Sequence, residues 1–186
     1  MTTTAKETAA GPDDLALVRA ARAGDASAQH ALYERYADRL HTLAAYTLGS
    51  RAAAEDALQS IFVKVFENLD RFQERAAFST WIWRIALNHC RDEIRRRRDF
   101  VPIEAILGSD DVTPERLHQV RQVETIVARA LQELSPKLRE VVVLRYVENL
   151  NYEEISAITG CSIGTVSSRL YRALEQLEKI LRPLRL

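Results

Sequence analysis

The 186-residue sequence contains few of the residues that mark several protein classes. It has six glycines and five prolines, which are too few for a collagen-like or low-complexity chain. No apolar run approaches the roughly 20 residues that a membrane-spanning helix needs. Residues 1–10 are rich in Thr and Ala and lack the apolar segment of a secretory signal peptide. We therefore expect a soluble, cytoplasmic protein.

Cysteine is also scarce. Cys90 and Cys161 stand alone, with no second cysteine or histidine at metal-ligand spacing, so neither a disulfide framework nor a zinc site is expected. We expect both to be small packing residues. The sequence also lacks paired carboxylates, a Gly-rich phosphate loop and a nucleophile with a neighbouring base. It therefore predicts no enzyme activity, no cofactor, no metal and no small-molecule substrate.

The chain has no net charge, because 26 Lys and Arg balance 26 Asp and Glu. This balance hides a segregation along the sequence. Residues 13–98 hold 14 basic and 12 acidic side chains, and residues 121–186 hold 10 and 8. Between them, residues 99–120 carry five acidic side chains and one Arg. Two mildly basic blocks thus flank an acidic connector, so the charge differs in sign between neighbouring parts of the chain.

The acidic connector also contains Pro102, Gly108 and Pro114, which favour turns and interrupt helices. We therefore predict a flexible acidic linker at residues 99–120, between two domains. The first domain would follow a disordered N-terminus at residues 1–12.

Both basic blocks have the periodicity of helices. In the first, apolar residues recur at spacings of three and four between breaks at Gly24–Asp25 and Gly49–Ser50. A further helix is expected to open at Phe78 and to run to about Arg98. No convincing strand pattern occurs. The sequence predicts an all-α fold of two small helical domains.

The second block has the start and stop signals of three successive helices. Ser135–Pro136 is an N-cap followed by proline at the first helical position, and we expect this helix to run to about Glu148. Asn151 and Glu154 have the spacing of a capping box at the start of the next, short helix. Gly160 then provides the residue at which that helix can stop.

The last helix of this block has two contrasting faces. Its apolar residues recur at intervals of three and four from Ile163 to Leu181. The opposite face near its start carries hydroxyl and guanidinium groups, which contact phosphates and base edges. The alternative is a plain helical hairpin with a solvated face. We favour a DNA-binding helix-turn-helix. Its candidate contacts are Ser162, Thr165, Ser168, Arg169 and Arg172.

Aromatic residues and arginines alternate in the second half of the first block, between residues 71 and 98. This mixture suits single-stranded DNA, since aromatic rings stack on bases and cations bind the backbone. The alternative is a buried aromatic cluster beside a solvated Arg face. Burial is the better interpretation for Trp81, whereas for Trp83 exposure and burial are equally supported. The run of arginines at 95–98 also suits a helix C-terminus without any binding role.

Three stretches of the first block, residues 56–62, 69–72 and 78–88, resemble region 2 of the bacterial extracytoplasmic-function (ECF) sigma factors of the sigma-70 family. Their sequences are DALQSIF, LDRF and FSTWIWRIALN.

In the second block, LSPKLREVV from Leu134, NYEEI from Asn151 and GCSIGTVSSRL from Gly160 are similar to region 4 of the same family. The double match, in the family's order and with its short linker, is more specific than either half.

The resemblance implies a dissociable subunit of bacterial RNA polymerase that gives promoter specificity. It implies three partners: core RNA polymerase, through the clamp of its largest subunit; promoter DNA; and an anti-sigma factor. Asp56, Gln59 and Phe62 match the core-binding helix, and the last helix of the chain matches the reader of the −35 element. The segment from Asp70 to Ala77 matches the loop that captures a flipped base of the −10 element. The candidate −10 contacts are Arg71, Phe72, Arg75, Phe78, Thr80, Trp83, Asn88, Arg91 and Arg95.

Two alternatives from other functional classes are left open by the residues. A homodimeric helix-turn-helix regulator would bind operator DNA without polymerase, whereas a sigma factor should not do so appreciably. An adaptor or anti-sigma-like protein would use only the N-terminal block. It would leave the Arg and aromatic residues and the helix-turn-helix unexplained.

Overall fold

The computed structural model describes residues 13–100 and 125–184, and these residues form helices joined by turns. The predicted disordered N-terminus lies outside the described residues, as does residue 101 onward of the predicted acidic linker. None of the described helices combines the length and apolar character needed to cross a membrane. The prediction of an all-α fold is confirmed for the described part of the chain.

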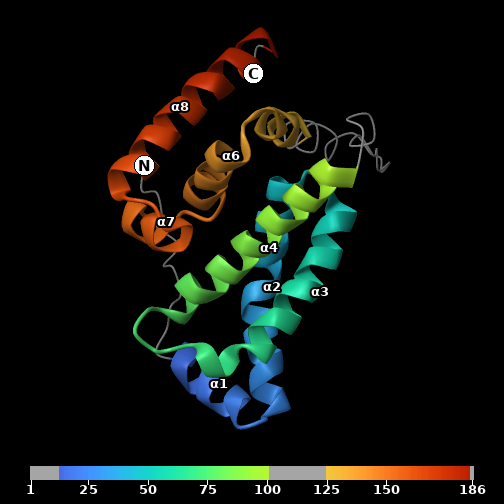
Figure 1. The fold of residues 1–186 in the computed structure, drawn as a ribbon, viewed down its shortest axis with the longest axis vertical. Coiled ribbons are helices and arrows are strands. Elements are labelled where there is room, and N and C mark those ends of the chain that lie inside the picture. The colour runs from blue at the N-terminus through green and yellow to red at the C-terminus, as the bar shows by residue number, and fades with distance from the viewer. Residues whose placement is uncertain (1–12, 101–124, 185–186) are drawn as a thin grey trace, which may run out of the picture.

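In the N-terminal part, residues 13–100, helix α2 packs against α1, α3 and α4 (Figure 1). Helix α4 continues past the predicted end at Arg98. The elements are α1 (Asp13–Arg22), α2 (Ala26–Leu48), α3 (Arg51–Glu67), the 3-10 turn η1 (Leu69–Arg71) and α4 (Phe78–Phe100).

The breaks predicted between the first helices are confirmed by their caps. The carboxylate of Asp25 accepts hydrogen bonds from the backbone N–H groups of Ser27 and Ala28, at 2.8 and 3.3 Å, at the start of α2. Gly49 ends α2 in the left-handed conformation, with φ of 71°. Ser50 then caps α3. These caps satisfy backbone groups that a helix end would otherwise leave unpaired.

The C-terminal part begins, within the described residues, with a helical stretch at 125–133. The elements after it are α6 (Pro136–Val142), the π-helical turn η3 (Val143–Val147), α7 (Tyr152–Thr159), α8 (Ile163–Leu181) and the 3-10 turn η4 (Arg182–Leu184).

The helix predicted to run from Pro136 to about Glu148 changes type part of the way along. Its α-helical part ends at Val142, and the backbone N–H of Glu148 donates to the carbonyl of Val143 at 3.1 Å, five residues back. A π-turn of this kind inserts one residue into the helical repeat. The sequence pattern could not register it, because every residue from Val141 to Leu144 is apolar and all four are buried.

The predicted signals around α7 and α8 are confirmed. Asn151 and Glu154 form a reciprocal capping box, with two hydrogen bonds of 2.8 Å between side chain and backbone. Gly160 ends α7 in the left-handed conformation at φ 72°, and the hydroxyl of Ser162 accepts from the backbone N–H of Thr165 at 3.2 Å. Helices α7 and α8 therefore form the two-helix unit that the sequence predicted.

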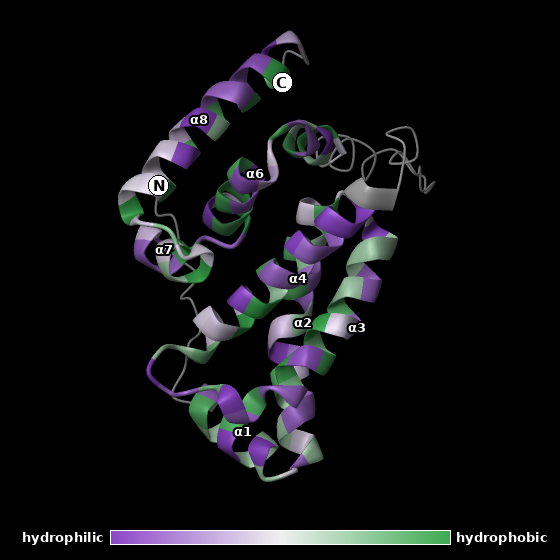
Figure 2. Cartoon of the chain, viewed as in Figure 1, coloured by the Kyte–Doolittle hydropathy of each residue, from purple (hydrophilic) through white to green (hydrophobic). Residues whose placement is uncertain are grey.

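A single hydrophobic cluster extends through both parts of the molecule. Trp83 and Phe78 of α4 and Leu131 of the C-terminal part are among its most fully buried members. Full burial of one such side chain contributes roughly 1.5–3 kcal/mol. Figure 2 shows hydrophobic and hydrophilic residues alternating along the helices, as expected when one side of each helix faces a core.

The two parts are also joined by buried polar contacts. Arg91 of α4 makes two hydrogen bonds with Glu140 of α6, at 2.8 and 2.7 Å, and the Glu140 side chain is 1% exposed. Arg39 of α2 pairs with Glu148 at 2.9 Å. Arg139 donates to the carbonyl of Thr47 at 2.6 Å. The sequence had left the arrangement of the two parts open, and the structure places them in direct contact.

Gly49 marks a close approach between the two parts. Besides its left-handed backbone, a Cβ atom at this position would lie 2.5 Å from Cδ of Gln132. The amide of Gln132 in turn donates to the carbonyl of Tyr46 at 2.8 Å. A side chain larger than hydrogen at residue 49 would therefore strain the α2–α3 turn and displace the Gln132 amide from Tyr46.

Candidate nucleic-acid interface

The first candidate surface lies at the start of α8. Ser162, Ser168 and Arg172 are exposed, whereas Thr165 and Arg169 are half-buried. These five residues share the N-terminal half of one helix, so the structure brings all the predicted −35 candidates together. Hydroxyl and guanidinium groups on the second helix of a helix-turn-helix match the chemistry of the DNA major groove.

Hydrogen bonds within the helix-turn-helix orient several of these groups. The hydroxyls of Ser162 and Thr165 lie 2.9 Å apart, and that of Ser168 donates to the carbonyl of Thr165 at 3.1 Å. One guanidinium nitrogen of Arg169 lies 3.6 Å from the sulfur of Cys161 in the preceding turn. Arg169 is thereby drawn toward the turn, while Arg172, one helical turn further on, extends into solvent.

The apolar side of α8 is buried only in its middle. Val166, Leu170 and Ala173 are buried against the rest of the C-terminal part, but Ile163 and Leu174 are 45% and 43% exposed. The apolar seam predicted from Ile163 to Leu181 is therefore only partly covered by the described residues.

The second candidate surface comprises the segment after η1 and the start of α4. Arg71 and Arg75 are exposed here, and Thr80 is half-buried. The exposed stretch continues through Gln73 to Ala77. Two cations on an irregular segment next to a helix give the electrostatic chemistry that a DNA backbone needs.

The aromatic candidates of this surface lie in the core rather than on it. Phe72, Phe78 and Trp83 are 4%, 2% and 1% exposed. Phe72 and Phe78 pack against each other with ring centroids 5.4 Å apart, and both contact the half-buried Trp81. The interpretation of Trp83 as an exposed ring is wrong, because its place on α4 faces the core that α4 shares with α2. In this arrangement the three buried rings offer no face to a base.

Trp83 is covered in part by residues that link the two halves. The guanidinium of Arg39 lies over its ring, 5.1 Å from the centroid, and the same guanidinium pairs with Glu148. Burial raises the pKa of Glu148, and the hydrogen bond from Arg39 opposes that shift. The indole N–H of Trp83 is buried without a hydrogen-bond partner among the described residues.

The polar candidates further along α4 are engaged with the C-terminal part or with one another. Arg91 donates to Glu140 and also to the side-chain oxygen of Asn88, at 3.2 Å. The hydrogen bond with Glu140 is the main reason that the pKa of Arg91 is raised. Arg84 donates to the carbonyl of Ala157 in α7 at 2.6 Å. Arg84 and Arg91 thus lie on the side of α4 that faces the C-terminal part, and both bond to it.

Arg95 lies beyond this contact. It is exposed and pairs only with its helical neighbour Asp92 at 3.0 Å, three residues before it. An exposed pair of this kind contributes little to stability and yields easily to another anion.

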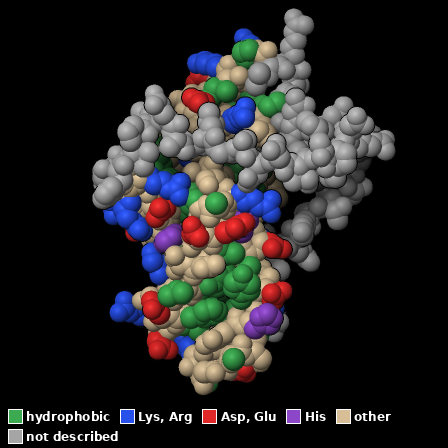
Figure 3. Space-filling model, turned by 90° about the vertical axis from the view of Figure 1, so that its right-hand side faces the viewer, with side chains coloured by type: hydrophobic (Ala, Val, Ile, Leu, Met, Phe, Trp, Pro, Cys, Tyr) green, Lys and Arg blue, Asp and Glu red, His purple; other side chains and the backbone are tan. Residues whose placement is uncertain are grey.

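The third candidate surface lies on α3. Asp56 and Gln59 are exposed, and Phe62 is 4% exposed beneath Tyr33 of α2, with ring centroids 4.6 Å apart. Val63 is 55% exposed beside them in the sequence. Figure 3 shows the side of the molecule on which α3 lies, where hydrophobic side chains gather between charged ones. Such a patch is typical of a protein-binding surface.

Sequence reasoning missed the residues that connect distant segments. Arg39 and Glu148 are 109 positions apart, Arg91 and Glu140 are 49 apart, and Arg22 contacts a segment about 50 positions downstream. Periodicity and capping rules operate over a few residues, so no local signal could have paired these groups.

No metal site emerges from the structure as far as it is described: nowhere in residues 13–100 and 125–184 do three His, Cys, Asp or Glu side chains gather as ligands. Cys90 is buried, and this burial raises its thiol pKa to about 12, so it stays protonated and unreactive at neutral pH.

Two family models match the chain. Residues 32–100 match the model described as "Sigma-70 region 2", and residues 124–177 match "Sigma-70, region 4". The first match lies in the N-terminal part and begins within α2, and the second lies in the C-terminal part and ends within α8.

Characterised relatives are similar over nearly the whole chain. The "ECF RNA polymerase sigma-E factor" of Haemophilus influenzae is 33% identical over 183 residues, which is 92% of this chain and 96% of the relative. The "ECF RNA polymerase sigma factor SigW" of Bacillus subtilis is 30% identical, over 90% of this chain and 96% of its own length.

Solved structures are similar as well. CnrH, in complex with the cytosolic domain of CnrY, superposes with a TM-score of 0.72 at 27% identity, over 91% of this chain and 97% of that one. The sigma factor RpoE of Bartonella quintana, in complex with the anti-sigma factor NepR, gives a TM-score of 0.66 at 26% identity. That match covers 82% of this chain and 96% of RpoE.

Proposed function

The chain belongs to the ECF sigma factors of the sigma-70 family, and from this membership we propose how its surfaces divide the work of promoter recognition. As an ECF sigma factor it is a non-catalytic subunit of RNA polymerase that directs transcription initiation at promoters. The adaptor alternative accounts for only the N-terminal half, and the homodimeric regulator would use its N-terminal half to dimerise or to sense a ligand, whereas the similarity to ECF sigma factors extends through both halves.

We assign residues 13–98 to region 2, residues 121–186 to region 4 and residues 99–120 to an acidic linker between them. The matched ranges and the extents of α4 and the helical stretch at 125–133 support these boundaries.

Region 4 would recognise the −35 element through the start of α8. The observation that supports this most directly is the set of five donor residues on one helix half, at the second helix of a capped helix-turn-helix. In this role Thr165, Ser168 and Arg169 would contact base edges, while Ser162 and Arg172 would bind phosphates at either end. Phosphate contacts position such a helix in the groove, and base contacts give specificity.

Region 2 would bind the melted −10 element with the segment Asp70–Ala77 and the exposed side of α4. Arg71, Arg75 and Arg95 are exposed and available to the DNA backbone. Capture of a flipped base requires a shaped pocket that offsets the cost of unstacking. The buried Phe72, Phe78 and Trp83 would support that pocket from within, together with the half-buried Thr80.

The α3 surface would bind the clamp of the largest core subunit. Asp56 and Gln59 would supply polar contacts. The buried Phe62 would support the partly exposed ring of Tyr33, which packs against it. An exposed apolar patch rimmed by polar groups is the usual composition of such an interface.

One −10 candidate, Arg91, is engaged with region 4 in this closed arrangement, because it bonds the buried Glu140, and the exposed Asn88 accepts a hydrogen bond from the same guanidinium. We infer that the two regions separate when core polymerase binds. Core polymerase would then hold both regions at the spacing of the promoter elements, which raises the effective concentration of each for its DNA. Free protein would bind DNA weakly, because its two regions have little net positive charge.

An anti-sigma factor is the expected inhibitor. CnrH is described in complex with CnrY, and RpoE in complex with the anti-sigma factor NepR, and both sigma subunits have the fold of this chain. We propose that this chain has a partner of the same class.

The proposed function is tested by run-off transcription with purified core polymerase on a library of random promoter fragments. Discrete start sites should appear only when polymerase and this protein are both present, and the shared sequences upstream would define the −10 and −35 elements.

The same assay separates the three surfaces. Variants Arg172→Ala, Arg75→Ala and Gln59→Ala should impair −35 use, −10 use and core binding respectively. Arg182→Ala, which removes an exposed arginine paired only within its helix end, is the matched control. Transcription that does not require this protein, together with retardation of particular fragments by the protein alone, would favour the regulator instead.

A further inference from the structure

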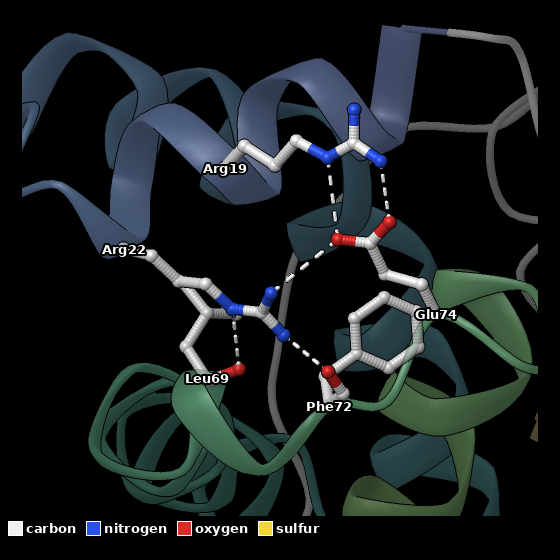
Figure 4. Close-up of polar contacts among 5 residues, drawn as sticks. All are labelled: Arg19, Arg22, Leu69, Phe72 and Glu74. Carbon is white, nitrogen blue, oxygen red and sulfur yellow. Dashed lines mark hydrogen bonds and ion pairs between the residues drawn. The ribbon is translucent and has the colours of Figure 1, made fainter.

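The C-terminal end of α1 holds the segment that follows η1 (Figure 4). Arg22 donates to the carbonyl of Leu69 at 3.0 Å and also to the carbonyl of Phe72. Its guanidinium lies 5.8 Å from the centroid of the Phe72 ring. A third contact, of 3.4 Å, reaches the carboxylate of Glu74. One arginine thus bonds η1 at Leu69 and the following segment at Phe72 and Glu74.

Arg19, one turn earlier on α1, completes the contact. It donates to both carboxylate oxygens of Glu74, at 3.2 and 2.5 Å, so this carboxylate is bound by two guanidinium groups. The two arginines differ in exposure, because the side chain of Arg19 is 66% exposed and that of Arg22 only 23%. Arg22 is therefore the structural contact, and Arg19 is an accessory.

Helix α1 is itself firmly placed, so these contacts fix the segment relative to the domain. Asp14 near its start is 4% exposed and accepts hydrogen bonds from Tyr36 and Arg35 of α2, both at 2.5 Å. Val18 of α1 is fully buried in the core.

The segment has few other ties in the described structure. Phe72 anchors it in the aromatic cluster with Phe78 and Trp81. From Gln73 to Ala77 every residue is exposed, and the side-chain hydrogen bonds recorded there are those of Glu74 with α1. The shape of this stretch is thus set by the bonds from α1 and the anchor at Phe72.

We propose that Arg22, supported by Arg19, is a positioning residue for base specificity at the −10 element, because it fixes the shape of the segment Phe72–Ala77 that captures the flipped base. This inference rests on the proposed function of that segment. A pocket discriminates between bases only if its groups are held in place before the base arrives, since a mobile segment adapts to any base and loses freedom on binding.

The geometry requires arginine rather than any cation. Two backbone carbonyls and a carboxylate are bound at once by the planar fork of a guanidinium. A lysine would place one point charge near Glu74 but could not bridge Leu69 and Phe72. Lysine at this position therefore separates a positioning role from simple charge neutralisation.

The test measures base preference with the reconstituted holoenzyme. Four templates differ only in the base at the flipped −10 position, and a fifth has an altered −35 element. The base ratio is the amount of transcript from the template with the preferred base divided by that from the template with the next-best base. The −35 ratio is the amount of transcript from the template with the intact −35 element divided by that from the template with the altered one. We expect Arg22→Ala to lower the base ratio at least about fivefold, the smallest effect usual for one base contact, and to leave the −35 ratio unchanged. Arg22→Lys should stay defective, and Glu74→Gln should fall between.

A uniform loss of transcript from all four templates, with the base ratio retained, would overturn the inference, because a purely stabilising residue acts in that way. Restoration of the ratio by Arg22→Lys would overturn it as well. Arg182→Ala is the control for removal of one arginine. Should Arg22→Ala fail to fold, as judged by circular dichroism, Arg19→Ala carries the test, because its side chain is exposed and only the accessory bond is lost. A lowered base ratio is then expected, and an unchanged ratio counts against the inference.

Variants of the segment itself distinguish this inference from the function on which it depends. If replacement of the exposed stretch Gln73–Ala77 by Gly and Ser residues lowers the base ratio but Arg22→Ala does not, only the positioning role is wrong. If neither change alters the ratio, the segment does not recognise the base, and both conclusions are wrong.

Discussion

The two DNA-binding surfaces of this sigma factor differ in how far their chemistry is accessible. On region 4, Ser162, Ser168 and Arg172 are exposed on α8, and their bonds are within the helix-turn-helix. On region 2, Arg91 bonds the buried Glu140 of region 4, and Trp83 is covered in the core. The proposed −35 surface is exposed in this arrangement, whereas Arg91 of the proposed −10 surface is bound to the other half of the same protein.

The difference follows from the cost of burying a carboxylate. Glu140 is 1% exposed and needs a cation, so Arg91 cannot serve a DNA phosphate while Glu140 stays buried. In the proposed function, binding of −10 DNA through Arg91 would draw on the fraction of molecules in which the regions are apart. The apparent affinity falls by that fraction.

The largest expected effect comes from breaking this contact. Arg91→Ala leaves Glu140 buried without a partner, which should cost about 2–3 kcal/mol. This cost is below that of breaking a fully buried pair, because the Arg91 side chain is one-third exposed and solvent screens it. The closed arrangement should give way, and small-angle X-ray scattering of the free protein should detect a larger radius of gyration.

Arg95→Ala is the matched control for this experiment, because Arg95 lies one turn further along α4 and pairs only with exposed Asp92. A folded Arg91→Ala protein with an unchanged radius would show that the hydrophobic contacts alone keep the regions together.

The next largest effect on promoter use is expected from substitutions on the proposed −35 surface of α8. Arg169→Ala and Arg172→Ala should each weaken use of promoters with an intact −35 element, by about 1–3 kcal/mol for a lost base contact and less for a phosphate contact. Binding to core polymerase, measured by fluorescence anisotropy, should not change. Loss of core binding in either variant would contradict the assignment of α8.

A smaller effect is expected on the α3 surface, which belongs to neither DNA contact. Asp56 is exposed, and no described ion pair holds it, so Asp56→Ala should leave the fold intact. Its loss should weaken core association by about 1 kcal/mol, as for a typical interface residue outside a hot spot. The ranking of promoters should be the same as for the wild type, and a changed ranking would count against the assignment.

The smallest expected effect is on the pH dependence of stability, to which His89 of region 2 and Glu148 of region 4 contribute in opposite directions. His89 of region 2 is buried, and burial together with the nearby Lys64, 2.9 Å away, lowers its pKa below the ordinary 6.5. The unfolded chain therefore takes up a proton first as the pH falls. Stability from this group is complete above pH 6.5 and is lost as the pH drops through the lowered value.

His89→Gln should remove this part of the pH dependence, as measured by urea unfolding between pH 5 and 8, a range of about three units around the ordinary histidine pKa. Glu148, whose pKa is raised by burial, changes stability in the opposite direction and serves as an internal comparison. An identical pH profile for wild type and variant would show that His89 does not contribute.

Local signals in the sequence were sufficient for most helix boundaries in both regions. The break at Gly24–Asp25, the capping box of Asn151 and Glu154 and the stop at Gly160 all depend on groups within a few residues of one another, and all are confirmed. The same kind of reasoning placed the donors of α8 on one face, because helical periodicity orders side chains around an axis.

The −10 surface was harder to predict for a physical reason. Phe72 and Trp83 have the composition of a base-stacking site, but burial depends on which other helices cover them. The same limit applies to the π-turn after Val142, where an unbroken apolar run conceals a one-residue change of register.

By itself, the sequence determined the helices, their caps, the two-part organisation and the family, because each depends on side chains near one another along the chain. Only the tertiary structure decided that Arg91 bonds Glu140, that Arg22 donates to the carbonyls of Leu69 and Phe72, and that Trp83 is buried. These contacts join positions tens of residues apart. Their partners are selected by the desolvation of buried charges and by shared core packing, which no local pattern encodes.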